Sequence, residues 1–148
     1  MTDTYVPSPS EGVADQVARY EASDGTDGGT LEGRPVVILT TVGARSGAIR
    51  KNPVMRIPHG DSYIAVASYA GAATDPAWYR NLIAHPELWV QDGAVKSRFL
   101  AREVFGEEKT HAWAVAEQFW PHFPEYRAKA RAREIPILVL EPVGDEQS

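Results

Sequence analysis

The hydrophobic positions of this 148-residue chain recur mostly in short blocks that are typical of β-strands. The run Val36-Val-Ile-Leu-Thr-Thr41 has no polar alternation, which predicts a strand covered on both faces. Five further strands are expected, at residues 49–57, 63–68, 88–91, 94–104 and 135–140. Asp92-Gly93 is typical of a two-residue hairpin turn, and Pro53 indicates an edge strand or a bulge.

Helical spacing is confined to a few segments. Val13, Val17 and Tyr20 lie at i, i+4 and i+7, which predicts a short amphipathic helix with Ser10 as its N-cap. We expect further helices at residues 75–84, where Asp75-Pro76 caps and starts the helix, and at 107–119 and 124–133. Strands in hairpin order with helices inserted late favour an antiparallel barrel over a doubly wound sheet. The predicted fold class is therefore α+β, with about six strands and flanking helices.

The chain is expected to divide into three segments. Residues 1–33 form a helical extension with a flexible Gly/Asp-rich stretch, residues 34–143 form the barrel domain, and residues 144–148 form a disordered tail. The preferred interpretation of the first helix is packing on the edge of the domain. A mobile lid or a peripheral contact with a membrane surface is the alternative.

Composition narrows the classes of protein and site. The contents of 43% hydrophobic and 24% charged residues are ordinary for a globular domain. The absence of cysteine excludes disulfides, thiolate metal sites and a thiol nucleophile. We expect a cytoplasmic protein, because the first residues lack a signal-peptide pattern and no apolar run approaches roughly 18 residues. A net charge of -5 argues against nucleic-acid binding.

One segment departs from this acidic balance. Between Gly33 and Gly60 there is no Asp or Glu, but there are five basic residues, Arg34, Arg45, Arg50, Lys51 and Arg56. This basic island surrounds the turn Gly43-Ala-Arg-Ser-Gly47. A cluster of cations beside a glycine turn indicates an anionic ligand, most commonly a phosphate. The alternative is a solvated surface strand.

Several common chemistries are excluded by spacing. The turn at residues 43–47 lacks the Gly-Lys-Ser/Thr of a phosphate-binding loop and the third glycine of a dinucleotide fingerprint. Ser68 does not lie in a Gly-x-Ser-x-Gly elbow. The four histidines show no metal-ligand spacing, so no metal is expected. What remains is a site with few titratable groups, as expected where a cofactor carries the chemistry.

Several ordered motifs together resemble a known family. The string Thr40-Thr-Val-Gly-Ala-Arg-Ser-Gly-Ala-Ile-Arg-Lys-Asn-Pro53 is followed by Ala65-Val-Ala-Ser68 and by Asp75-Pro-Ala-Trp-Tyr-Arg-Asn-Leu82. Over roughly residues 35–142 the chain resembles the deazaflavin (F420)-dependent nitroreductases of actinobacteria. The resemblance implies a split β-barrel related to flavin-mononucleotide-binding proteins. It also implies an oxidoreductase in which reduced F420 passes a hydride to a quinone, an activated alkene or enone, or a nitroaromatic.

The resemblance also implies roles for individual residues. The cofactor's phosphate and acidic tail would be held by Arg45, Ser46, Gly47 and Arg50, with Lys51 reaching the distal tail. The deazaflavin would be lined by Asn52, Pro53 and Val54, and the pocket completed by Ala67, Ser68, Gly71, Trp78 and Asn81. On a regular strand Arg50, Asn52, Val54 and Arg56 share one face, and Lys51, Pro53 and Met55 the other.

The substrate side of the site follows from the same resemblance. Ser68 is the candidate catalytic group, because its hydroxyl could bond the substrate oxygen or the edge of the cofactor. Substrate-lining positions are Met55, Trp120, Phe123 and Tyr126, although an aromatic stripe at this spacing is also typical of a core. Met55 stands where a tyrosine is expected, which argues against nitro compounds more than against cofactor binding.

Other functions remain open at this point. One is an oxidoreductase of the same fold that uses flavin mononucleotide. Another is a non-catalytic carrier of F420, heme or lipid. The basic residues favour an anionic deazaflavin, and the protein could act as a monomer or a homodimer.

Overall fold

The computed structural model describes residues 4–68, 74–130 and 134–143. Within them the chain forms one curled, fully antiparallel sheet. Its strands are β1 (Thr30–Leu31), β2 (Arg34–Val42), β3 (Ile49–Met55), β4 (Pro58–His59), β5 (Ser62–Val66), β6 (Glu87–Asp92), β7 (Val95–Glu103) and β8 (Ile137–Pro142). Neighbouring strands follow the order β3-β2-β6-β7-β8-β5-β4, and β1 pairs with the start of β2.

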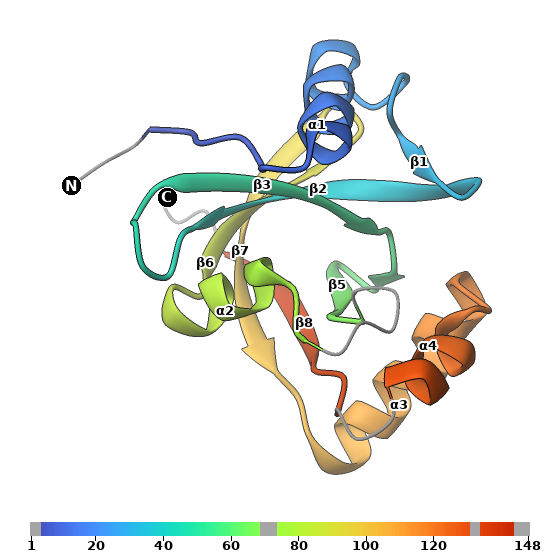
Figure 1. Ribbon diagram of the computed structural model, residues 1–148. Coiled ribbons are helices and arrows are strands. Elements are labelled where there is room, and N and C mark those ends of the chain that lie inside the picture. The colour runs from blue at the N-terminus through green and yellow to red at the C-terminus, as the bar shows by residue number, and fades with distance from the viewer. Residues whose placement is uncertain (1–3, 69–73, 131–133, 144–148) are drawn as a thin grey trace.

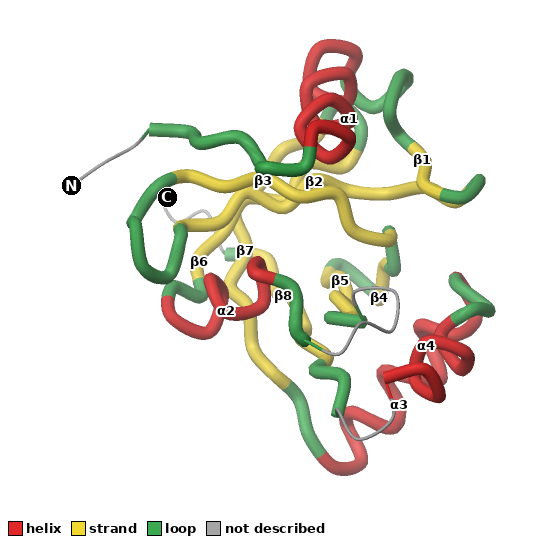
Figure 2. Tube along the Cα trace, viewed as in Figure 1, coloured by secondary structure: helices red, strands yellow, loops and turns green. Residues whose placement is uncertain are grey.

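The curled sheet is open on one side. Its two ends are β3, which pairs with β2, and β4, which pairs with β5. The chain passes from β3 to β4 through two residues, but no ladder joins β3 to β4 or β5 in the described part of the chain. Figure 2 shows β2 and β3 lying across the other strands as one wall of a half-barrel. The predicted split-barrel fold is confirmed.

Four helices flank the sheet within the described residues. They are α1 (Glu11–Ser23), α2 (Ala77–Ala84), α3 (Gly106–Phe119) and α4 (Phe123–Ala130). Figure 1 shows α1 and α2 on opposite sides of β2 and β3, with α3 and α4 together near β5. The predicted cap of α1 is confirmed, because Ser10 Oγ accepts a hydrogen bond from the Val13 N–H at 3.3 Å.

The long strand β2 is buried on both faces, as its unbroken apolar run predicts. Val36 and Ile38 pack against Val17 and Tyr20 of α1. The alternate residues of β2 face the interior and join a cluster with α2 and the other strands, which includes Val37, Leu39, Ala65, Ala67, Trp78, Leu82, Val90, Phe99 and Leu138. Each such buried side chain contributes about 1.5–3 kcal/mol. The apolar stripe of α1 is therefore used in packing on the sheet.

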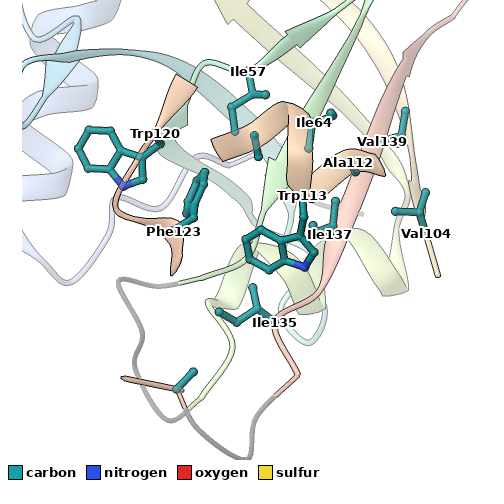
Figure 3. Packing of buried hydrophobic residues seen from close by; sticks show 12 residues of the cluster. Ile57, Ile64, Val104, Ala112, Trp113, Trp120, Phe123, Ile135, Ile137 and Val139 are labelled. Carbon is teal, nitrogen blue, oxygen red and sulfur yellow. The ribbon is translucent and has the colours of Figure 1, made fainter. Parts of the chain in front are cut away.

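A second interior cluster lies under α3 and α4. Trp113 of α3 and Phe123 of α4 meet edge to face, with ring centroids 5.9 Å apart. Figure 3 shows them with Trp120 over the isoleucines of the sheet. The full cluster also contains Ile57, Ile64, Val104, Ala112, Ala116, Ala130, Ile135, Ile137 and Val139.

The structure corrects several predicted details. The short strands β1 and β4 were not predicted, because two residues cannot show an alternating pattern. Asp92 pairs with Val95, so the hairpin loop is Gly93-Ala94, one residue later than expected. The β2–β3 register runs unbroken through Pro53, which marks an edge strand and no bulge. Pro76 occupies the N-cap of α2 without a side-chain hydrogen bond, and the helix begins at Ala77.

The remaining expectations concern the ends of the chain. The Gly/Asp-rich stretch after α1 is tied back to that helix, since Gln16 Nε2 donates to the carbonyls of Gly28 and Thr30 at 2.9 and 3.0 Å. Arg19 also pairs with Asp27 at 2.8 Å. The predicted tail at residues 144–148 lies outside the described residues. In the part of the chain that is described, no helix has the length and apolar character to cross a membrane.

Candidate cofactor site

The glycine turn between β2 and β3 is held by its own backbone. The Gly47 N–H donates to the Gly43 carbonyl at 3.0 Å, and the Gly43 N–H donates to the Ala48 carbonyl at 2.7 Å. Gly47 has a φ of +72°, which favours glycine. A Cβ on Gly43 would lie 2.7 Å from Ser46 Oγ, which itself accepts from the Ala48 N–H at 3.1 Å. Both glycines and the serine hydroxyl therefore fix the shape of the turn.

Helix α2 is hydrogen-bonded to this turn through a buried side-chain amide. Asn81 is 6% exposed, and its Oδ1 accepts a hydrogen bond from the Ala44 N–H at 3.0 Å. Its Nδ2 donates to Thr41 Oγ1 at 3.2 Å. Trp78, one turn earlier in α2, packs in the interior cluster. Asn81, predicted to line the pocket, uses both ends of its amide to position the arginine-bearing turn.

The register of β3 decides which of its side chains face the interior. Arg50 pairs with Thr41, Asn52 with Leu39 and Val54 with Val37, so the three predicted residues share the interior-facing side of β2. All three are partly buried.

The intervening residues of β3 lie on the opposite face. Lys51 Nζ is 2.6 Å from Glu21 Oε2 on α1. The structure thus separates Lys51 and Pro53 from Arg50 and Asn52. Lys51 already has an anionic partner within the protein.

The end of β5 supplies the remaining predicted positions. Ala67 and Ser68 are 0% and 7% exposed, and the Ala67 N–H donates to the Pro136 carbonyl at 2.9 Å. Ala67 also packs with Trp78 in the interior cluster. Gly71 lies outside the described residues.

The five cations of the basic island divide into two groups. Arg34 donates to the Phe119 carbonyl at 3.1 Å, Lys51 pairs with Glu21, and Arg56 pairs with Asp92 at 2.8 Å. Arg45 and Arg50 make no ion pair or side-chain hydrogen bond with the described residues. Arg45 is exposed on the turn, and Arg50 is partly buried on the interior side of β3. Two unpaired guanidinium groups beside a glycine turn fit a multiply anionic cofactor.

Comparisons with known proteins agree with a site for an anionic cofactor. Residues 13–142 match the model of a family described as F420H(2)-dependent quinone reductase. The chain belongs to this family. The predicted identification is therefore confirmed, and the protein is an oxidoreductase whose cofactor is reduced coenzyme F420.

Relatives of this chain are known as sequences and as structures. The F420H(2)-dependent quinone reductase Rv1261c of Mycobacterium tuberculosis is 29% identical over 127 residues, which cover 83% of this chain and 85% of that protein. A solved F420-H2 dependent reductase, FDR-A, is 41% identical, with a TM-score of 0.68 over 73% of this chain and 95% of its own. A chain solved as a domain-swapped dimer is 40% identical, with a TM-score of 0.70 over 90% of this chain and 100% of its own. The heme storage protein HutZ of Vibrio cholerae, at 15% identity and a TM-score of 0.55 over 76% of this chain and 84% of its own, shares the fold alone.

The predicted substrate residues lie in, or pack against, the second interior cluster. Trp120 and Phe123 are 1% and 2% exposed, so the core interpretation describes their packing. Met55 and Tyr126 are partly buried against the same cluster. Trp120 Nε1 is buried and has no hydrogen-bond partner among the described residues. Figure 3 shows this indole at the margin of the cluster, beside Phe123.

Two cavities lie away from these residues. One of about 470 Å³ is lined by residues of α3, α4 and the approach to β8. The other, about 540 Å³, lies between α1 and the segment that leads to β1. Neither is lined by a predicted cofactor residue. The candidate site is defined by its turn, its cations and its strand face.

Sequence reasoning missed some contacts around the site. Glu21 and Tyr5 both contact Lys51, with the Lys51 Nζ 4.7 Å from the centre of the Tyr5 ring. Thr41 holds the amide of Asn81. Strand alternation predicts that Lys51 leaves the site face, but no local pattern identifies partners 30 or more residues away.

Two partly buried tyrosines form short hydrogen bonds with carboxylates. Tyr63 donates to Asp92 at 2.5 Å, and Tyr79 donates to Glu103 at 2.7 Å. Burial, and then the neighbouring carboxylate, raises the pKa of each tyrosine to about 12. Both tyrosines therefore stay protonated at neutral pH. Tyr63 connects β5 to β6, and Tyr79 connects α2 to β7.

Proposed function

We propose that Arg45 and Arg50 bind the anionic part of reduced F420 and that the enzyme reduces a quinone. The observation that carries this proposal is the division of the basic island. Three of its cations have partners within the protein, while Arg45 and Arg50 have none in the described chain. An arginine without a protein carboxylate keeps its donors available for a phosphate or carboxylate ligand.

Other residues of the site would hold and orient the cofactor. The hydrogen bonds within residues 43–48 fix the shape of the turn and would hold Arg45 in place beside the anion. Asn52 and Val54 would line the deazaflavin on the interior side of β3, and Asn81 keeps the turn in place through Ala44. Lys51 is left out of the proposed set, because Glu21 neutralises it on the other face.

The proposed substrate is a quinone, as the family's description indicates. When bound, reduced F420 supplies a hydride to the acceptor. Ser68, buried beside the interior cluster, would bond the reacting oxygen.

The alternative functions and assemblies that the sequence left open are no longer equally well supported. The family match favours F420 over flavin mononucleotide. The likeness to a heme storage protein is one of fold alone, so it does not support a heme carrier. Between the two assemblies expected, the 40% identical domain-swapped chain favours a homodimer.

Cofactor binding tests the proposed role of the arginines. Quenching of F420 fluorescence by the protein gives the Kd, and we expect Arg50→Ala to raise it about tenfold or more, since a charge-assisted hydrogen bond contributes about 1.5–3 kcal/mol. Added salt should weaken wild-type binding more steeply than binding by the variant, because the variant has one ionic contact fewer.

Arg98→Ala is the matched control. Arg98 is exposed on β7 and makes no side-chain hydrogen bond or ion pair with the described residues. Its removal should leave the Kd within twofold of wild type. Equal weakening by both variants, or no weakening by Arg50→Ala, would contradict the proposal.

A further inference from the structure

The N-terminal arm, residues 4–8, lies along the free edge of β3. The Ile49 N–H donates to the Thr4 carbonyl at 2.8 Å, and the Val6 N–H donates to the Ile49 carbonyl at 2.9 Å. Tyr5 and Ile49 form a parallel bridge. In Figure 1 the dark-blue segment that leads to α1 passes beside β3. The arm thus takes up the edge hydrogen bonds of the residue immediately before Arg50.

The residue immediately after Arg50 is held from the outer face. The Lys51 ammonium lies 4.7 Å from the centre of the Tyr5 ring and 2.6 Å from Glu21 Oε2. The Lys51 and Glu21 side chains are 16% and 29% exposed, so this ion pair is partly shielded from water. The arm therefore acts twice, through the Thr4 carbonyl and the Val6 N–H at Ile49 and through the Tyr5 ring at Lys51.

These contacts bear directly on Arg50. Side chains alternate along a strand, so holding Ile49 and Lys51 fixes the backbone from which Arg50 projects to the other face. The Arg50 backbone pairs with Thr41 of β2, but the Arg50 side chain makes no hydrogen bond or ion pair with the described residues. The arm lies outside residues 13–142, the range that matches the family. It is a feature of this chain that the family assignment does not explain.

We propose that the arm, with Glu21, is a positioning element for Arg50, so that docking of the arm and binding of F420 stabilise each other. This inference rests on the proposed role of Arg50. Holding the backbone in place before the ligand arrives lowers the entropy lost on binding. Since coupling between two binding events is reciprocal, F420 must also strengthen the docking of the arm.

Tyr5→Ala tests the arm, and Tyr5→Phe is its matched control. Tyr5→Ala removes the ring over Lys51 and should raise the Kd for F420 about three- to tenfold, because the backbone around Arg50 is then held less firmly before the ligand binds. Tyr5→Phe keeps the ring and should bind F420 as wild type does. At saturating F420H2, the kcat of both variants with menadione should match wild type, because the arm acts on binding.

A double-mutant cycle separates this inference from the proposed function. In the Arg50→Ala background, Tyr5→Ala should have no further effect on the Kd, because the arm acts through Arg50. The same fold-change in both backgrounds would overturn the positioning role while leaving the role of Arg50 intact. An unchanged Kd in Arg50→Ala alone would overturn the proposed role of Arg50, and the coupling with it.

Amide hydrogen exchange provides a readout in the absence of cofactor. Tyr5→Ala should speed exchange at the Ile49 amide, which donates to the arm, and Tyr5→Phe should not. Added F420 should slow exchange at the Val6 amide of the wild type. A lower melting temperature for Tyr5→Ala with an unchanged Kd would show a structural role only and would contradict the proposal.

Discussion

Arg50 and Lys51 are neighbours that carry the same charge, and the structure uses them in opposite ways. Lys51 faces α1 and pairs with Glu21 at 2.6 Å, so its charge is neutralised within the protein. Arg50 faces the interior side of β3, and its side chain has no ion pair or hydrogen bond with the described residues, so it is available for the proposed ligand. To find which cations of the basic island could bind a ligand, the partner of each cation is therefore more informative than the total charge.

In the proposed function, Ser68 is the residue whose role is most specific to the reaction. Ser68→Ala should lower kcat about tenfold, which corresponds to the loss of about one hydrogen bond to the reacting oxygen. The Kd for F420 should stay within twofold of wild type, because phosphate binding is assigned to the arginines. Stopped-flow oxidation of F420H2 by menadione and fluorescence titration measure the two quantities. Parallel losses in kcat and in affinity would contradict a catalytic role for this hydroxyl.

At the level of elements, the site depends on contacts between segments far apart in sequence. The turn after β2 is held by α2 through Asn81, and the edge of β3 is held by residues that precede α1. A carboxylate also connects distant strands. Asp92 of β6 accepts hydrogen bonds from Arg56, which follows β3, and from Tyr63 of β5. These hydrogen bonds bridge strands that no ladder joins, which helps to close the half-barrel.

The Tyr63 bond predicts how stability changes with pH. Burial and Asp92 raise the pKa of Tyr63 to about 12 from an ordinary value of 10.0, so the folded protein keeps a proton that the unfolded chain loses. The resulting stabilisation is complete below pH 10 and decreases as the pH rises toward 12. Urea unfolding at about pH 9 and about pH 11 should show a smaller loss of stability for Tyr63→Phe than for wild type. Equal losses in the two proteins would contradict this assignment.

The sequence predicts the elements better than their contacts. The face shared by Arg50, Asn52 and Val54 was predictable, because it requires only a regular strand. The role of Asn81 was not, since its partners lie about 40 residues earlier and nothing in its local pattern identifies them. Aromatic spacing at Trp120 and Phe123 is the same for a core and for a substrate wall. Only their burial in the structure distinguishes the two.

On the scale of the whole molecule, the two faces of the edge strand β3 have different surroundings. One face of β3 packs against α1 and the N-terminal arm, and the other carries the residues assigned to the cofactor. Both faces belong to the same seven-residue strand, so few residues separate the contacts with α1 from the residues assigned to the cofactor. The fold thus explains why an acidic protein can hold a small cationic site in a fixed place.

The central claim is that Arg45 and Arg50 hold reduced F420 for transfer of a hydride to a quinone. Its most direct test is the anaerobic rate of F420H2 oxidation by menadione, measured against F420H2 concentration for wild type and for Arg45→Ala/Arg50→Ala. We expect wild type to turn over, and the double variant to show a KM for F420H2 raised about 100-fold at a similar kcat, since two charge-assisted bonds are lost. No turnover by wild type, or the same KM in both proteins, would contradict the account.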